Sequence, residues 1–398
     1  MNRLSKRVQQ LTPSPTLAIT AKAQELKAAG HNVIGLGAGE PDFNTPKHIL
    51  EAAKKAMDEG QTKYTPSSGI PKLRQAIVDK LSRENGLTYV PSQITVTVGA
   101  KHGLYNLFQV LLNKGDEVIV PMPYWVSYLD QITLAEGQPV ILTTDEQQNF
   151  KITPEQLEAA ITEKTKAVLI NSPSNPTGMV YTPEELQKIG EICVKYDLWI
   201  ISDEIYEHLV YDEQFSPVSI ASLDPRFYER TFVINGVSKT YSMTGWRIGF
   251  VAGPADVINV MNDLSSHSVS NPTSIAQFAA LAAFTGPQEP VKKMKAAFKE
   301  RRDYVVNRIH EIEGLSCLTP PGAFYVFINI RKALEESPYQ NSDEWSTALL
   351  EKEQVAVVPG SAFGSNHHVR ISYATSIEDL QEAFKRIEHF TSHLAVNR

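Results

Sequence analysis

Seven short β-rich runs, separated by helical patterns, constrain the fold of this chain more than any other feature. The runs lie at residues 94–98, 117–120, 139–142, 167–171, 198–202, 231–234 and 248–252. A helix is expected over 183–196, with Thr182 as its N-cap. Strands that alternate with helices predict an α/β domain whose mostly parallel sheet is covered by helices.

The pattern changes after Gly286 and indicates a second, smaller domain. Helices are expected at 291–312, 342–352 and 377–394, and apolar runs lie at 323–330, 355–358 and 369–373. This mixture predicts an α+β domain, with Thr285, Gly286 and Pro287 as the hinge. We therefore expect a large domain over 46–286, and an N-terminal arm over 1–45 that joins 287–398 in the small domain.

Composition excludes several classes of function. The 398 residues suggest two or three domains, and 42% hydrophobic with 21% charged residues is typical of a soluble globular protein. A net charge of -7 without a dense Lys/Arg block argues against nucleic acid or an anionic membrane as the main partner. No secretory signal or membrane-spanning stretch is recognised, so a cytoplasmic location is expected. Cys193 and Cys317 are isolated, which favours reduced thiols over a disulfide or a metal pair, and no metal site is predicted.

Polar side chains follow three of the strand-like runs. Asn175 follows the run at 167–171, Asp203 and Tyr206 follow 198–202, and Lys239 follows 231–234. Each could be ordinary turn chemistry: an Asn-Pro turn, an N-cap aspartate or a turn lysine. Ligands of open α/β sheets, however, lie beyond the carboxyl ends of the strands. Polar residues at three successive strand ends predict a ligand site. Lys239, which lies among small residues, suits a Schiff base with a carbonyl cofactor such as pyridoxal 5′-phosphate (PLP).

A phosphate site is predicted on the same edge. Gly99 and Ala100 follow the run at 94–98 and lead into a helix expected to start near Lys101. Backbone N–H groups at a helix N-terminus bind anions, and Arg247 adds a cation with bidentate geometry. The glycines between Gly35 and Gly39 do not have dinucleotide-binding spacing.

These motifs together resemble the fold-type I PLP enzymes, and within them the class I aminotransferases. The resemblance covers nearly the whole chain, and the sequence looks most like the bacterial branch of the aspartate aminotransferases. It is carried by the segments at 37–43, 64–66, 171–178, 202–206, 236–249 and 369–372.

The resemblance implies a role for each residue around the cofactor. Lys239 would carry the Schiff base and, once freed, act as the general base. Asp203 would pair with the pyridine nitrogen, Tyr206 and Asn175 would hydrogen-bond the phenolic oxygen, and Trp125 would stack on the ring. The phosphate would be held by Gly99, Ala100, Lys101, Ser238 and Arg247, and by Tyr64 from a second subunit, which implies a homodimer.

The resemblance also implies a substrate side. Arg370 would clamp the α-carboxylate, and Gly39, Trp125 and Asn175 would border the substrate. The expected reaction is ping-pong transamination of aspartate and 2-oxoglutarate to oxaloacetate and glutamate, with the N-terminal segment 14–18 and the small domain closing over the substrate.

One departure from the better-known aspartate aminotransferases concerns the distal carboxylate. The arginine that binds it there is missing from residues 265–273, so Lys101 is the expected substitute and His267 the second candidate. Alternatives are a class I aminotransferase for aromatic, alanine or prephenate substrates, and a PLP lyase or decarboxylase. A PLP-binding regulator is disfavoured, because no added DNA-binding segment is recognised.

Overall fold

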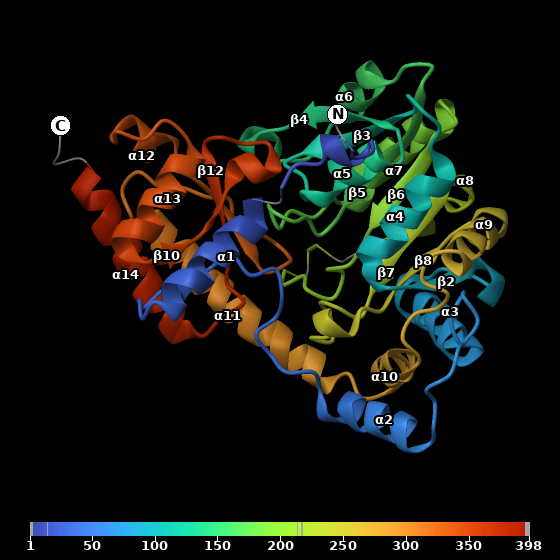
Figure 1. The fold of residues 1–398 in the computed structure, drawn as a ribbon. Helices are drawn as coiled ribbons and strands as arrows, with labels where there is room; N and C mark the ends of the chain where they lie inside the picture. Colours follow the sequence, from blue (N-terminus) through green and yellow to red (C-terminus); the bar gives the residue numbers. More distant parts are fainter. Residues whose placement is uncertain (1–2, 14, 213, 216–217, 395–398) are drawn as a thin grey trace.

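A twisted seven-stranded sheet forms the centre of the larger part of the molecule (Figure 1). We describe it from a computed structural model, which covers residues 3–13, 15–212, 214–215 and 218–394. The strands lie in the order β2 (Ile94–Thr97), β8 (Gly249–Ala252), β7 (Thr231–Gly236), β6 (Trp199–Asp203), β5 (Thr165–Asn171), β3 (Glu117–Met122) and β4 (Gln138–Thr143). Only β8, among these strands, runs antiparallel to its neighbours. The predicted mostly parallel α/β sheet is confirmed, and every strand lies within two residues of its expected position.

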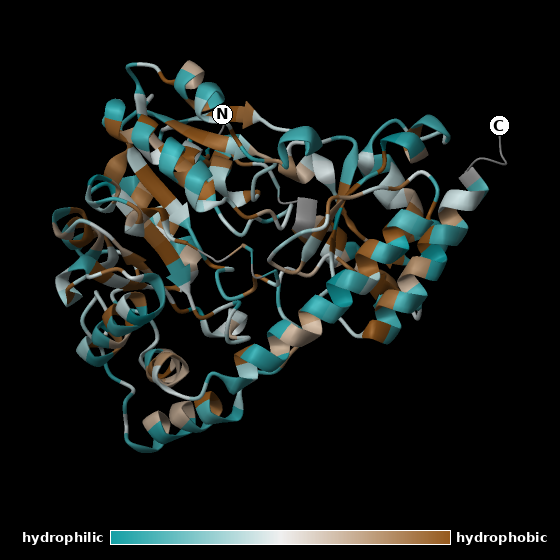
Figure 2. Cartoon of the chain, turned by 180° about the vertical axis from the view of Figure 1, so that it is seen from behind, coloured by the Kyte–Doolittle hydropathy of each residue, from teal (hydrophilic) through white to brown (hydrophobic). Residues whose placement is uncertain are grey.

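Both faces of this sheet are buried under helices. On one face, α4 (Gly99–Leu111), α5 (Ser127–Leu134) and α9 (Ala255–Ser266) pack against Val118 and Val120. On the other face, α6 (Pro154–Ala160), α7 (Pro183–Lys195) and α8 (Pro225–Tyr228) pack against Ile119. Because successive strand residues point to opposite faces, a sheet covered on both sides needs continuous apolar runs. Figure 2 shows these strands as hydrophobic bands between helices with polar outer faces.

The expected N-cap of α7 is confirmed. The Thr182 hydroxyl accepts a hydrogen bond from the backbone N–H of Glu185. In return, the Glu185 carboxylate accepts a hydrogen bond from the backbone N–H of Thr182. This reciprocal pair satisfies two donors that a helix start otherwise leaves open.

Three helices extend the large part at its edge. α2 (Lys47–Asp58), α3 (Pro71–Asn85) and α10 (Ser274–Thr285) share a core with β2 and β8.

The 3-10 turns are η1 (Val8–Gln10), η2 (Pro91–Gln93), η3 (Glu146–Gln148), η4 (Ile220–Ser222), η5 (Thr244–Trp246) and η6 (Gly360–Phe363).

The smaller part is built on a three-stranded antiparallel sheet, β11 (Val358–Pro359), β12 (His368–Ser372) and β9 (Tyr325–Asn329). Its helices are α11 (Glu289–Glu311), α12 (Arg331–Glu335), α13 (Ser342–Glu353) and α14 (Ile377–Leu394). The arm joins it through α1 (Pro15–Ala28) and through β1 (Ile34–Gly35), which pairs in parallel with β10 (Val355–Ala356).

The long helix α11 runs from the edge near α10 into the small part (Figure 1). The core of the small part includes Ile34 and Leu36 of the arm, and it continues into the large part through Ile205, Tyr206, Leu209 and Tyr211. On this basis we propose that the boundaries expected from the sequence, 46–286 against 1–45 with 287–398, divide two domains.

Two minor expectations concern cysteines and membranes. Cys193 and Cys317 are free and buried, as predicted. Across the described residues, no helix has both the length and the apolar character that crossing a membrane requires.

Candidate active site

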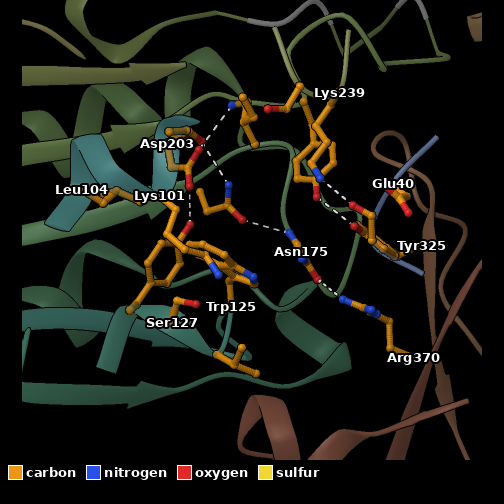
Figure 3. A pocket seen from close by; sticks show the side chains of 18 of the residues that line it. Glu40, Lys101, Leu104, Trp125, Ser127, Asn175, Asp203, Lys239, Tyr325 and Arg370 are labelled. Carbon is orange, nitrogen blue, oxygen red and sulfur yellow. Dashed lines mark hydrogen bonds between the residues drawn. The ribbon is translucent and has the colours of Figure 1, made fainter. Parts of the chain in front are cut away.

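A cavity of about 620 Å³ opens where the carboxyl ends of β5 and β6 face the small domain (Figure 3). The structure brings eleven of the predicted residues to its lining: Gly39, Ala100, Lys101, Trp125, Asn175, Asp203, Tyr206, Ser238, Lys239, Arg247 and Arg370. Gly99 lies directly beside the cavity and contributes backbone only. The residues expected from strand ends and those expected from the resemblance therefore border one cavity.

Lys239 lies on the loop that follows β7, and its ammonium donates to the carbonyl of Gly39. Burial lowers the pKa of this lysine to about 8. Glu40 opposes that shift, and the cations Arg247, Arg370 and Lys101 reinforce it. A lysine with this pKa is partly neutral near neutral pH, which is what attack on a carbonyl requires.

Asp203 ends β6 and is buried. Its Oδ2 accepts from the hydroxyl of Tyr128 at 2.6 Å, and its Oδ1 accepts from the backbone N–H of Ile205 at 3.3 Å. Burial nevertheless raises the pKa of Asp203 to about 6, because the two hydrogen bonds and the charge of Lys239 compensate only part of the desolvation. A cationic ring nitrogen placed against this carboxylate would stabilise its charged form and lower its pKa again.

The corner around Gly99 fits a phosphate. Gly99 has φ +78°, and a Cβ there would collide with the guanidinium of Arg247. Helix α4 starts at Gly99 rather than near Lys101 as expected, so Gly99 and Ala100 belong to its first turn. Arg247 adopts a left-handed conformation, φ 56°, and donates to the Thr244 carbonyl at 2.8 Å. This corner combines the N–H groups of a helix start, a glycine that leaves room for a ligand, and an arginine. These are the features of an anion site.

Arg370 faces the cavity from β12, on the small-domain side. Its Nη1 donates to Asn175 Oδ1 and its Nη2 to the Gly37 carbonyl, each at 2.8 Å. Its Nε is buried and has no partner among the described residues. An unpaired guanidinium N–H in a buried position is costly, and the permanent positive charge of Arg370 at the cavity wall suits a ligand carboxylate.

Two tyrosine hydroxyls join the two domains across the cavity. Tyr206 and Tyr325 are hydrogen-bonded at 2.8 Å, and the guanidinium of Arg370 lies 4.4 Å from the centroid of the Tyr325 ring. Burial raises the pKa of Tyr206, so the hydroxyl stays protonated and can donate.

Lys101 lines the cavity, with its ammonium 4.8 Å from the centroid of the Trp125 ring. Burial and the neighbouring Arg247 lower its pKa. His267, by contrast, follows the end of α9 and does not belong to the lining that the described residues form. Of the two cations expected for a second carboxylate, Lys101 is therefore the one that borders the cavity.

Tyr64 and the N-terminal segment 14–18 differ in how they relate to the cavity of a single chain. Tyr64 is 90% exposed and is absent from the described lining. In the segment expected to close over substrate, Ser14 is outside the described residues, whereas Leu17 of α1 lines the cavity.

Sequence reasoning missed several lining residues: Glu40, Ser127, Tyr128, Asn171 and Tyr325. Glu40 accepts from the Thr244 hydroxyl at 2.6 Å, so it ties the arm to the loop of Lys239. Tyr325 stands in an apolar run, where an aromatic residue indicates only a core strand. The proximity of Tyr128 to Trp125 was the one available signal for that residue.

Comparisons with known proteins agree with this geometry. A family described as "Aminotransferase class I and II" matches residues 31–387. The chain is 59% identical to an aspartate aminotransferase of Geobacillus stearothermophilus, with 98% of each chain covered. It is 50% identical to an aspartate/prephenate aminotransferase of Cereibacter sphaeroides, over 98% of this chain and 99% of the relative.

Among solved structures, an aspartate aminotransferase of Thermus thermophilus with maleate superposes with a TM-score of 0.92 at 44% identity, covering 98% of this chain and 100% of that one. The predicted fold-type I architecture agrees with this likeness. From the family match and the full-length identity together, this chain is a member of the class I and II aminotransferases.

Proposed function

We propose that this protein is a PLP-dependent aminotransferase that converts aspartate and 2-oxoglutarate to oxaloacetate and glutamate. The observation that carries the proposal is one cavity lined by Lys239 with its lowered pKa, by the buried Asp203 and by the cationic Arg370. Relatives at 59% identity that are named aspartate aminotransferase support the choice of substrate.

The residues present fit PLP. The first turn of α4, with Ser238 and Arg247, would hold its phosphate, and Asp203 would face its ring nitrogen. Tyr206 and Asn175 would face its phenolic oxygen, and Trp125 would cover its ring. When bound, PLP supplies a carbonyl that condenses with amines and a ring that accepts electrons from the substrate Cα.

The chain's own groups then handle protons and charge. The Lys239 amine, whose pKa is lowered to about 8, would act as the general base that takes the proton from the substrate Cα. Asp203, positioned by Tyr128, stabilises positive charge on the ring nitrogen. Tyr206 donates a hydrogen bond, and closure of the small domain excludes water.

Substrate selection falls to two cations. Arg370, which lines the cavity, would bind the α-carboxylate through its guanidinium, and Lys101, in the first turn of α4, would reach the distal carboxylate. The similar Thermus aspartate aminotransferase was solved with maleate, a four-carbon dicarboxylate, which supports a pocket with two carboxylate positions.

We also propose that the protein acts as a homodimer, in which Tyr64 reaches the phosphate of the neighbouring subunit. Its 90% exposure on the single chain leaves the ring available for such a contact. A cytoplasmic location stays a prediction.

Steady-state kinetics test the proposal. Purified protein loaded with PLP is assayed for oxaloacetate with aspartate and 2-oxoglutarate varied in turn, and parallel double-reciprocal lines are expected. Alanine and phenylalanine as donors, and prephenate as acceptor, are measured alongside. Prephenate is the second candidate, because the Cereibacter relative is named for both substrates. Turnover of other amino acids without aspartate turnover would contradict the assignment.

A further inference from the structure

A polar network with a buried ion pair at its centre and a partly exposed edge lies near the loop of Lys239, and none of its members belongs to the cavity lining. Its members are Lys80, Glu84 and Asn85 of α3, Glu207 and His208 after Tyr206, and Asn235 of β7. Lys80 is 1% exposed and Glu207 is 6% exposed, so this is an ion pair placed in the protein interior. Burying charges costs free energy unless every group finds a partner.

The network satisfies its charges fully. The Lys80 ammonium donates to Glu207 and to Asn85 Oδ1 at 2.7 Å. Glu207 also accepts from Asn85 Nδ2 at 2.8 Å and from Asn235 Nδ2 at 2.7 Å. Burial acts to raise the pKa of Glu207, but the charge of Lys80 and the hydrogen bonds from Lys80 and Asn85 oppose it, and the pKa is lowered.

Its place in the chain links it to the site on both sides of Lys239. Asn235 lies at the end of the strand that leads into the lysine loop, and Thr240 directly follows Lys239. The Thr240 hydroxyl, itself buried, lies 3.1 Å from His208 Nδ1. Glu207 and His208 in turn follow Tyr206 and so belong to the segment that begins with Asp203.

The histidine has a defined tautomer. Its Nε2 lies 2.9 Å from Glu84 Oε2, and a carboxylate only accepts, so Nε2 carries the proton. In the neutral ring Nδ1 then accepts from the Thr240 hydroxyl. Burial would raise the pKa of Glu84, but His208 and Lys80 together lower it to about 2, so the carboxylate stays ionised.

Glu84, Glu207 and His208 could also be read as a metal site, because one ligand atom of each lies within 4.8 Å of the others. The Lys80 ammonium bonds to Glu207 and lies 3.6 Å from Glu84, so a cation already occupies this position. The cluster is therefore an internal ion-pair network.

We propose that this network positions Lys239 relative to Asp203 and Tyr206, and that the His208–Thr240 hydrogen bond is the link through which it reaches the lysine. The inference rests on the proposed function, since it concerns how Lys239 meets the cofactor. A network in which every polar group is paired stabilises one conformation of the segments that carry it, because alternative conformations would leave polar groups unpaired.

Two matched pairs of variants test the link. Thr240→Val removes the hydroxyl, and Thr240→Ser keeps it. His208→Gln places an amide near the position of Nε2 and keeps the Glu84 contact, whereas His208→Asn mimics Nδ1 and keeps the Thr240 contact. For each purified variant we would measure the dissociation constant of PLP from the cofactor-free protein, the circular dichroism of the bound cofactor's absorption band, and the melting temperature of the cofactor-free protein.

Thr240→Val and His208→Gln are expected to weaken PLP binding about fivefold and to change the circular dichroism of the band, as loss of one buried hydrogen bond implies. Thr240→Ser and His208→Asn are expected to stay within about twofold of the parent, on the same reasoning. The proposal is overturned if only the melting temperatures change, or if all four variants weaken equally. A parent that binds no PLP contradicts the proposed function itself; a parent that binds PLP without using aspartate contradicts only the substrate assignment.

Discussion

The two sides of the cavity are built differently. The large-domain side takes Asp203 from the carboxyl end of a parallel strand, and Asn175 and Lys239 from the loops that follow two of its neighbours. The small-domain side takes Tyr325 and Arg370 from within an antiparallel sheet. Parallel strands end at one edge, so successive loops converge there whatever the sequence. In an antiparallel sheet, a residue's place depends on register and on how the domain docks.

This difference also separates the proposed tasks. The large-domain side carries the groups that fit the cofactor, and the small-domain side, with the cationic Arg370, would bind the substrate carboxylate. Substitutions on the first side should therefore impair chemistry with any amino acid, and those on the second should mainly impair substrate binding.

Lys239→Ala should have the largest effect. Without the amine, no group at the site can shuttle the Cα proton, and the turnover number is expected to fall by about 10⁴-fold. The protein should still hold PLP through its phosphate. Absorption spectra after gel filtration, together with kcat, check both statements. Activity close to the parent's would remove Lys239 from the mechanism.

Asp203→Asn should come next. The amide keeps the shape and the contact with Tyr128, but it cannot stabilise a protonated ring nitrogen, so kcat is expected to fall about 10³-fold for every donor. Tyr128→Phe is the matched control, because it removes the hydrogen bond and leaves the carboxylate. If kcat survived Asp203→Asn while KM for one donor rose, the large-domain side would share in substrate binding, against the division of tasks.

Arg370→Ala should raise KM for amino acid and keto acid substrates, lowering kcat/KM about a hundredfold, as loss of a charged, bidentate contact implies. The dissociation constant of PLP should stay within about threefold of the parent, because no direct contact is lost. Arg370→Lys keeps the charge and loses the fork. A PLP affinity that collapses with Arg370→Ala would break the proposed separation.

The pH dependence of cofactor capture probes the large-domain side alone. Only the neutral amine attacks a carbonyl, and burial lowers the pKa of Lys239 to about 8. The rate of covalent PLP capture by the cofactor-free protein should be constant above this pKa and fall about tenfold for each pH unit below it. Stopped-flow absorbance measures the rate. A rate that is still rising with pH at 10 would place the pKa near the ordinary lysine value.

Lys101→Ala should have the smallest effect and the most selective one. Although desolvation lowers its pKa, Lys101 keeps solvent-accessible surface on the single chain. Its contact with the distal carboxylate is therefore worth about 1 kcal/mol, or roughly fivefold in kcat/KM for aspartate. Alanine, which has no distal carboxylate, is the internal control. Equal losses for alanine and aspartate would rule out the specificity role.

The same contrast explains how far sequence reasoning reached. The strands from 94 to 252, the order of elements and the cofactor-side residues could be predicted, because apolar periodicity and strand-end position are local signals. Tyr128 and Tyr325 could not, because their hydroxyls meet Asp203 and Tyr206 only after α5 and β9 have packed.

Helix α4 starts at Gly99, two residues before the expected position near Lys101. Gly99 has a left-handed φ, and glycine has a low helix propensity, so the sequence favours a later start. Arg370 was identified through resemblance alone, since a strand arginine has no local mark of function.

The most direct measurement is the absorption spectrum of the PLP-loaded protein during sequential substrate addition. Aspartate alone should bleach the cofactor band in a stoichiometric half-reaction, and 2-oxoglutarate should restore it. A spectrum that responds to neither substrate would contradict the proposal that this site transfers an amino group between these two acids.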